Sequence, residues 1–217
     1  MLTRSLALPG EWRGGSPFRP QQSFVDVSDG QRGIAVFNQG LPEYEGKTDV
    51  DRTIALTLVR GVGHLSDADA PGSPETPGAQ CLGRQVCRYA IYPHAGSWEE
   101  ADVWQQAHAF NTPVRCVQAT EHPGELPANA SLLELRPNNL VLSAVKRAED
   151  EEAVIVRFYN PTAVPAEGDL RLHFPVTAAY RANLNEECGE ALPVSDDGRR
   201  IHVTARGKEI VTLLLLP

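Results

Sequence analysis

The sequence lacks the short motifs by which the commonest self-contained enzymes are identified. No GxSxG nucleophile elbow, no phosphate-binding glycine loop and no HExxH metal helix occurs in its 217 residues. The glycines of "RGVGHL" carry no phosphate signal, and the six histidines never lie four residues apart or in an HxH pair. Spacing therefore predicts no metal site, and we assign no cofactor to this chain.

Long apolar runs and an excess of basic residues are also missing. A membrane-spanning helix needs about 20 consecutive apolar residues, and the opening "MLTRSLALPGEWRGG" is interrupted by Pro9 and Gly10 before it forms a signal-peptide core. With 20 Lys and Arg against 28 Asp and Glu, the net charge is -8. Nucleic acids and anionic membranes require clustered basic residues. We therefore expect no nucleic acid partner, no membrane partner and a cytoplasmic protein.

Cysteine is scarce. Cys81, Cys87, Cys116 and Cys188 lie at spacings that match neither a zinc ribbon nor a CxxC redox motif. Four cysteines are few for a disulfide framework in a chain of this length, so we expect reduced and mostly buried thiols. Cys87, in the apolar stretch "VCRYAIY", is expected to be a small core side chain rather than a nucleophile.

Short alternating runs, separated by Gly, Pro, Asn and Asp, dominate what is present. "RGIAVFNQG" alternates Ile34 and Val36 with Ala35 and Phe37, and "RTIALTLVRGVG" alternates in the same way. "QVCRYAIYP" is a third strand, which we expect Pro93 to end because proline cannot donate to a β-ladder. This pattern is typical of an all-β protein built from antiparallel sheets.

One segment has helical rather than strand periodicity. In "SWEEADVWQQAHAF", Ser97 and Glu100 have the spacing of a capping box, and apolar residues recur every three positions from Trp98. We therefore expect one short helix near residues 97–110. The stretch 67–79, "DADAPGSPETPGA", is rich in Pro, Gly and acidic residues and is predicted to be an exposed loop.

The pattern changes after "TEHPGELPANASL", which we interpret as a domain boundary near residues 120–131. Six further strand-like runs follow it: "NLVLSAVK", "EAVIVRFYN", "GDLRLHF", "AAYRANL", "RRIHVTA" and "KEIVTLLLLP". Turns such as "EDE" and "DDG" join them. These runs predict a small antiparallel β-sandwich of its own.

A polar segment between the first two strands is the best candidate site. In "GLPEYEG", Glu43 and Glu45 lie two residues apart, so an extended chain would place both carboxylates on one face, roughly 6 to 7 Å apart. Glycosidases commonly use two carboxylates about 5 to 5.5 Å or about 6.5 to 9.5 Å apart. The plain alternative is a solvated turn between strands. With Asn38, Tyr44 and Arg52, these residues form the polar set beside an aromatic ring that a carbohydrate site uses.

His94 is the histidine most worth following. In "YPHAGSW" it lies beside Pro93 and Trp98, next to the predicted helix. Such a loop suits either a sugar-facing or interdomain surface, or a plug that closes the end of a sandwich.

Several longer motifs occur in a fixed order: "GIAVFNQGLPEYE", "RTIALTLVRGVGHLS", "YAIYPHAGSW" with "AHAFNTPV", and "LVLSAVKRAEDEEAVIVRFYN". Together they resemble the C-terminal β region of family-38 α-mannosidases, and most closely the bacterial branch of these glycoside hydrolases. The resemblance extends from about Val25 to Pro217. It implies that residues 1–120 are the C-terminal part of a large mannosidase-type β-sandwich and that residues 121–217 are the small terminal one.

The resemblance also implies where the chemistry of such an enzyme resides. In the family, a zinc ion, an aspartate nucleophile and an acid/base aspartate belong to an N-terminal α/β domain, which is followed by a three-helix segment and the two sandwiches. None of that domain is found in this sequence. We therefore expect no catalytic residues here, no activity of this chain alone, and a zinc ion only in the absent catalytic domain.

What remains for this chain is a supporting role. The resemblance implies a C-terminal fragment that supports the catalytic domain and borders its sugar pocket, with carbohydrate binding and mannose metabolism as its context. Two alternatives stay open: a free-standing carbohydrate-binding module, or a separately encoded subunit that completes a mannosidase. A chain that begins within a sandwich should expose an apolar face to the catalytic domain or to a second copy. The residues expected to bind a mannoside are Asn38, Glu43, Tyr44, Glu45 and Arg52.

Overall fold

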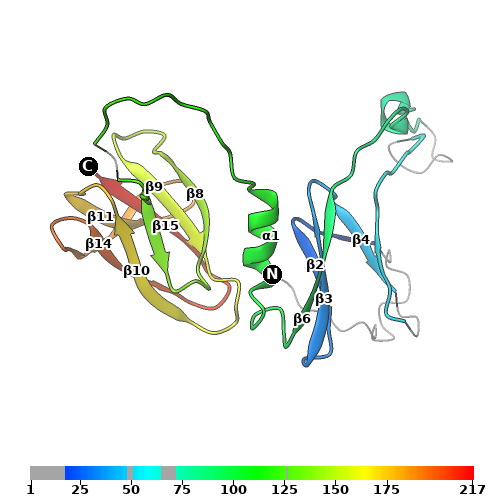
Figure 1. Cartoon of the computed structure of the whole chain (residues 1–217), viewed down its shortest axis with the longest axis horizontal. Helices are drawn as coiled ribbons and strands as arrows, with labels where there is room; N and C mark the ends of the chain where they lie inside the picture. The colour runs from blue at the N-terminus through cyan, green and yellow to red at the C-terminus, as the bar shows by residue number, and fades with distance from the viewer. Residues whose placement is uncertain (1–17, 48–50, 65–71, 126) are drawn as a thin grey trace. The chain divides into compact units, whose positions relative to one another are not determined.

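A computed structural model describes residues 18–47, 51–64, 72–125 and 127–217 (Figure 1). The described residues fall into two compact units, which we call the N-terminal unit (up to residue 118) and the C-terminal unit (from residue 119). Each unit holds two antiparallel sheets, and one α-helix occurs among the described residues. The predicted all-β fold with one short helix is confirmed. The assignment of residues 1–120 and 121–217 to a larger and a smaller sandwich stays a prediction.

The N-terminal unit contains two three-stranded sheets. In the first, the strand order is β2 (Phe24–Ser28), β3 (Arg32–Asn38) and β6 (Tyr89–Ala95). In the second, the order is β1 (Phe18–Pro20), β4 (Glu43–Gly46) and β5 (Ile54–Leu56). A 3-10 turn, Pro77–Gln80, lies at the end of the segment 67–79, which was predicted to be an exposed loop. Residues 67–71 of that segment lie outside the described part.

The predicted alternation of β3 decides which face of the first sheet is buried. Ala35 and Phe37 point into a core against helix α1 (Val103–Asn111), which presents the fully buried Val103 and Ala107. Phe37 also stacks on Tyr92 of β6, with ring centroids 5.4 Å apart. One face of this three-stranded sheet is therefore covered by the helix.

The predicted capping box forms, but it precedes the helix. The Ser97 N–H donates to Glu100 Oε2 at 2.8 Å, and the Glu100 N–H donates to Ser97 Oγ at 3.3 Å. Asp102 then adopts a left-handed backbone with φ +48°, which interrupts the helical path. Turns therefore fill residues 98–102, and α1 begins only at Val103.

The end of β6 differs from the prediction. Pro93 does not end the strand, which continues to Ala95, and Pro93 is registered opposite Ile34 of β3. The strand order leaves β6 at the edge of its sheet. A proline is tolerated on an edge strand because its missing N–H is not needed by a further neighbour. The prediction failed because the sequence does not reveal which strands lie at an edge.

The C-terminal unit is a sandwich of a five-stranded and a four-stranded sheet (Figure 1). The five-stranded sheet has the order β12 (Cys188–Leu192), β11 (Ala178–Ala182), β15 (Ile210–Leu216), β9 (Val154–Tyr159) and β8 (Val141–Arg147). The four-stranded sheet has the order β13 (Val194–Ser195), β14 (Arg200–Ala205), β10 (Ala166–Leu172) and β7 (Leu133–Arg136).

One shared core holds these two sheets together. Phe158 and Leu213 of the five-stranded sheet are fully buried in the same cluster as Leu170 and Ile201 of the four-stranded sheet. Burying each such side chain stabilises the fold by about 1.5–3 kcal/mol. All six predicted runs contribute a strand to this sandwich.

A buried asparagine holds the chain where β9 ends. Asn160 Nδ2 donates to the Val164 carbonyl at 2.7 Å, while Oδ1 accepts from the Thr162 N–H at 2.9 Å and from its hydroxyl at 2.8 Å. The asparagine of the "RFYN" motif therefore anchors a turn, since its side chain replaces the hydrogen bonds that a strand partner would supply.

The C-terminal unit should lose stability in acid. A hydrogen bond from Arg200 holds the pKa of Asp169 below its ordinary 3.8, and one from Lys146 holds the pKa of Glu186 below its ordinary 4.5. Because the folded pKa values are lowered, this stabilisation is complete above the ordinary pKa values. It is lost progressively as the pH falls below the ordinary values and through the lowered pKa values of the folded protein. Thermal unfolding followed by circular dichroism between pH 7 and pH 3 should show a falling midpoint. Glu186→Gln should make that fall shallower, and an unchanged slope in this variant would contradict the assignment.

Candidate functional site

The structure places three of the five predicted sugar-binding residues on one strand. Glu43, Tyr44 and Glu45 lie on β4, the middle strand of the β1-β4-β5 sheet. Because side chains alternate along a strand, the two carboxylates point to one face and the tyrosine to the other. Arg52 lies in an exposed turn before β5, with a left-handed φ of +55°. Among the described residues, no side-chain hydrogen bond or ion pair joins two of the five.

Glu43 instead has partners that the sequence analysis did not single out. Its Oε1 accepts from the Thr57 hydroxyl at 2.9 Å, and its Oε2 lies 2.8 Å from Nη1 of Arg60. Its side chain is 19% exposed, so it is half-buried while Arg60 reaches over it from solvent. The strand register explains the contact with Thr57. Tyr44 pairs with Leu56, so Thr57 lies opposite Glu43 just beyond the last pair of the ladder.

Asn38 lies at the end of β3 and is fully buried. Its Oδ1 accepts from the Leu41 N–H at 2.9 Å, and its backbone carbonyl accepts from Asn111 Nδ2 at 3.0 Å. Its Nδ2 has no partner among the described residues. Asn38 therefore holds the turn between β3 and β4 and ties it to the end of α1.

His94 is buried in the N-terminal unit. Its Nε2 lies 2.7 Å from Asp26 Oδ1, and the two side chains are only 2% and 10% exposed. The ring stacks on Tyr92 at a centroid distance of 6.0 Å and lies directly over Gly33 of β3, where a side chain would collide with it. Of the two readings that the sequence left open, burial favours a structural one: His94 ties β6 to β2 across the strand between them.

The cysteines are not where the sequence analysis placed them. Cys81, Cys116 and Cys188 are exposed and Cys87 is half-buried, and all four thiols are free. The prediction of mostly buried thiols was wrong. Cys87 precedes β6, which begins only at Tyr89, so Cys87 itself is not part of the strand that packs on the core.

No metal or membrane-spanning element is found in the described ranges. Over these residues, no group of three or more His, Cys, Asp or Glu side chains could hold a metal ion. Within the same ranges, no helix is long and apolar enough to cross a bilayer.

Part of the face of the β2-β3-β6 sheet opposite α1 is apolar and exposed, although Val25, which pairs with Val36 on the same face, is buried. Ile34 of β3 is 48% exposed, and Ile91 and Tyr89 of β6 are 65% and 53% exposed. The register places Ile91 opposite Val36, so these side chains share one face. We call this surface, formed by Ile34, Tyr89 and Ile91, the open apolar face. Monomeric proteins rarely leave large contiguous apolar patches uncovered.

Comparison with known proteins gives a consistent result. Residues 139–213, from β8 to β15, match the family described as "Glycosyl hydrolases family 38 C-terminal beta sandwich domain". The crystal structure of an alpha-mannosidase from Enterococcus faecalis V583 superposes with a TM-score of 0.78 and 32% identity, covering 100% of this chain and 23% of that chain. The chain is homologous to the C-terminal β-sandwich region of family-38 glycosyl hydrolases. The resemblance predicted from the sequence motifs is confirmed.

Curated relatives extend the same family-38 relationship. The "Putative mannosylglycerate hydrolase" of Halalkalibacterium halodurans is 31% identical over 207 residues, which are 94% of this chain and 21% of that protein. Alpha-mannosidase 2C1 of Homo sapiens is 29% identical over 197 residues, which are 89% of this chain and 17% of that protein. This family-38 region therefore spans about a fifth of the length of the curated relatives that it matches.

Proposed function

We propose that this chain serves as the C-terminal β region of a family-38 hydrolase of mannosides, supporting the catalytic domain and bordering its sugar pocket. The observation that carries the proposal is the open apolar face of the β2-β3-β6 sheet. Ile34, Tyr89 and Ile91 lie side by side on it, and burying each against a partner contributes about 1.5–3 kcal/mol. The names of the relatives, a mannosylglycerate hydrolase and α-mannosidases, support a mannoside as the substrate class.

The docking half of this proposal is tested with a charged substitution on the open apolar face. A polypeptide that carries a family-38 catalytic region is mixed with this chain, and association is measured by sedimentation velocity. Ile91→Glu should weaken association at least tenfold, or about 1.4 kcal/mol, because it would bury an unpaired carboxylate. Val114→Glu is the matched control, since Val114 is an apolar residue in the same unit that is 90% exposed outside any strand.

Three outcomes would count against docking through this face. Association that Ile91→Glu leaves unchanged would move the contact elsewhere. Equal weakening by the Val114→Glu control would make the effect non-specific. A stable homodimer of the chain alone that Ile91→Glu dissociates would assign the face to self-association instead.

The pocket-edge half concerns Glu43 and Glu45. In the mixture of this chain with the catalytic polypeptide, replacing both residues by Gln should raise KM for a mannoside by about 3- to 10-fold with little change in kcat. The reason is that losing a charge-assisted hydrogen bond weakens binding of the ground state and of the transition state alike. Glu99→Gln, an exposed carboxylate in the turns before α1, is the control. Loss of turnover with substrate binding and docking intact would overturn the assignment, since it would make these carboxylates catalytic.

A further inference from the structure

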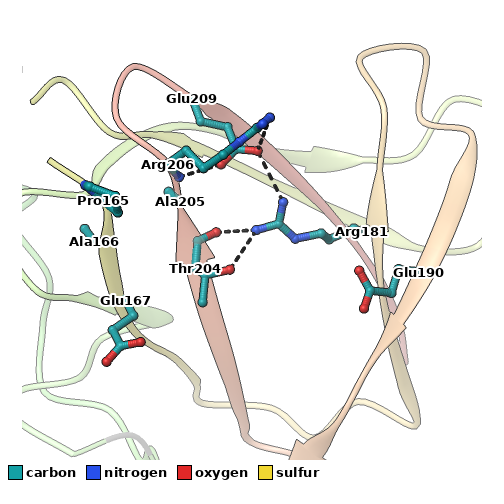
Figure 2. A pocket seen from close by; sticks show the side chains of 9 residues that line it. All are labelled: Pro165, Ala166, Glu167, Arg181, Glu190, Thr204, Ala205, Arg206 and Glu209. Carbon is teal, nitrogen blue, oxygen red and sulfur yellow. Dashed lines mark hydrogen bonds and ion pairs between the residues drawn. The ribbon is translucent and has the colours of Figure 1, made fainter. Parts of the chain in front are cut away.

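A recess of about 670 Å³ opens at one edge of the C-terminal sandwich. It lies between β10 and β14 of the four-stranded sheet and β11 and β12 of the five-stranded sheet (Figure 2). Its polar side chains come from both sheets and from the turn before β15: Glu167, Arg181, Glu190, Thr204, Arg206 and Glu209.

Arg181 bridges the two sheets at the centre of this recess. The guanidinium donates to the Thr204 carbonyl and, at 3.2 Å, to the Thr204 hydroxyl, as Figure 2 shows. On one side of β14, strand β13 pairs only with Ile201 and Arg200, so it does not reach Thr204. On the other side, Thr204 pairs with Glu167 of β10. The recess exists because β13 ends early and leaves this part of the β14 edge open.

Glu209 is fully engaged within the protein. Its Oε2 accepts from the Arg206 N–H at 2.6 Å, and its Oε1 lies 3.4 Å from Nη1 of Arg181 and 3.4 Å from Nη2 of Arg206. Burial alone would raise the pKa of Glu209, but the Arg206 N–H and the two guanidinium groups outweigh it and lower that pKa. Glu209 therefore positions Arg181 rather than facing a ligand as a free carboxylate.

Glu167 and Glu190 differ from Glu209. Both are exposed, and within the described ranges neither side chain has a hydrogen bond or ion pair. In Figure 2, Glu190 projects from β12 into the recess, on the side of Arg181 away from Thr204. The recess thus presents the carboxylates of Glu167 and Glu190 as free hydrogen-bond acceptors. It also presents the guanidinium of Arg181 and the hydroxyl of Thr204.

A second hollow of about 200 Å³ adjoins the first. It shares Arg181, Glu190 and Thr204 with the larger recess, and its walls include Leu192 and Pro193. Because the two hollows share these three residues, we treat them together and call them the β12–β14 cleft. One part of this cleft is polar and the other is apolar.

We infer that the β12–β14 cleft binds a neutral sugar residue. An anionic ligand would meet the uncompensated carboxylates of Glu167 and Glu190, and an amine would meet the guanidinium groups of Arg181 and Arg206. A hydroxyl group satisfies both sets, because it donates to a carboxylate and accepts from a guanidinium. The apolar face of a pyranose ring can lie against Leu192 and Pro193.

This inference goes beyond the proposed docking function and rests on different residues. The open apolar face belongs to the N-terminal unit, whereas the β12–β14 cleft lies wholly in the C-terminal unit. A glycan held here would be a second contact with carbohydrate, separate from any contact that Glu43 and Glu45 make. Ile91→Glu should therefore leave sugar binding at the cleft unchanged. Docking through the open apolar face and sugar binding at the cleft can thus be disproved separately.

The test titrates the full chain with methyl α-mannoside and follows backbone amide shifts by NMR. Saturable shifts of Arg181, Glu190 and Thr204 are expected, with a Kd on the order of 1 mM. Glu190→Gln should weaken binding about 5- to 10-fold, because a charge-assisted hydrogen bond becomes a neutral one. Thr204→Val, which keeps the branched shape of the side chain, should weaken it about 3-fold. Glu134→Gln, an exposed carboxylate on the far edge strand β7, should have no effect.

Several results would overturn the inference. Absence of saturable binding up to about 100 mM would remove the site. Equal weakening by Glu190→Gln and Glu134→Gln would place binding elsewhere. Shifts at the cleft caused by acetate or spermidine, but not by the mannoside, would replace the sugar with a charged ligand.

Discussion

Replacing Gly168 with Ala should unfold the C-terminal unit. Gly168 lies on β10, and a Cβ added there would stand 2.0 Å from the Arg136 carbonyl oxygen and 2.6 Å from Pro137 Cδ. The obstacle is backbone rather than a rotatable side chain, so relief requires β7 to move away from β10. The pairing of Asp169 with Arg136 would then be lost. We expect a cost of about 4 kcal/mol or more, which is a large part of the net stability of a domain this size.

This prediction has a matched control and a local readout. Gly124→Ala introduces the same methyl group in the same unit, where nothing lies within 4 Å of the added Cβ, and should change stability by less than about 0.5 kcal/mol. Methyl NMR signals of the core residues packed around Phe158 would report on the C-terminal unit. Tryptophan fluorescence would report on the N-terminal unit, because all three tryptophans precede residue 118. Retention of dispersed core signals in Gly168→Ala would contradict the close approach of these strands.

Replacing Gly33 with Ala should destabilise the N-terminal unit by about 2–4 kcal/mol. The new Cβ would lie 2.5 Å from Cε1 of His94 and 2.9 Å from Cβ of Ser28. The His94 ring cannot swing aside without leaving Asp26 buried and unpaired, because the two are joined at 2.7 Å. Denaturant unfolding followed by tryptophan fluorescence would measure the loss, since Trp98 packs against the core of this unit.

A double-mutant cycle separates the clash from any other effect of the substitution. His94→Ala alone removes the hydrogen-bond partner of Asp26 and should itself be destabilising. In that background, Gly33→Ala should cost at least about 1 kcal/mol less than in the native chain, because the ring is gone and only Ser28 Cβ remains close. Strict additivity of the two substitutions would mean that the ring does not occupy the space above Gly33.

Most strands could be predicted from sequence because alternation is a local property. The run around Ala35 and Phe37 shows which residues face inward, and the structure buries both. Among the described residues, the strands β1, β2, β4, β7, β12 and β13 were missed. Runs such as "CGEAL" carry no apolar alternation and depend on a neighbouring strand for their hydrogen bonds. The start of α1 was also predicted too early, because the left-handed Asp102 leaves no mark in a periodicity of apolar residues.

The candidate site was only partly accessible to sequence. The position of Glu43 and Glu45 on one face of a strand follows from their spacing alone. Glu43 lies 14 positions from Thr57 and 17 positions from Arg60. Their contacts depend on the register between β4 and β5, which the sequence does not specify. Whether these carboxylates contact a sugar stays a prediction, and the Glu43 and Glu45 substitutions above test it.

The sequence by itself determined the all-β class, the single short helix and the relationship to family-38 hydrolases. The fold class and the helix follow from local periodicity, which each segment carries on its own. The relationship follows from the resemblance of several motifs, in a fixed order, to that family. Only the tertiary structure decided that His94 meets Asp26, which is 68 positions away, and that Arg181 meets Thr204, which is 23 positions away. Such meetings depend on strand register, strand order and the early end of β13. Those properties arise from many weak contacts acting together across the sheets, so no single segment encodes them.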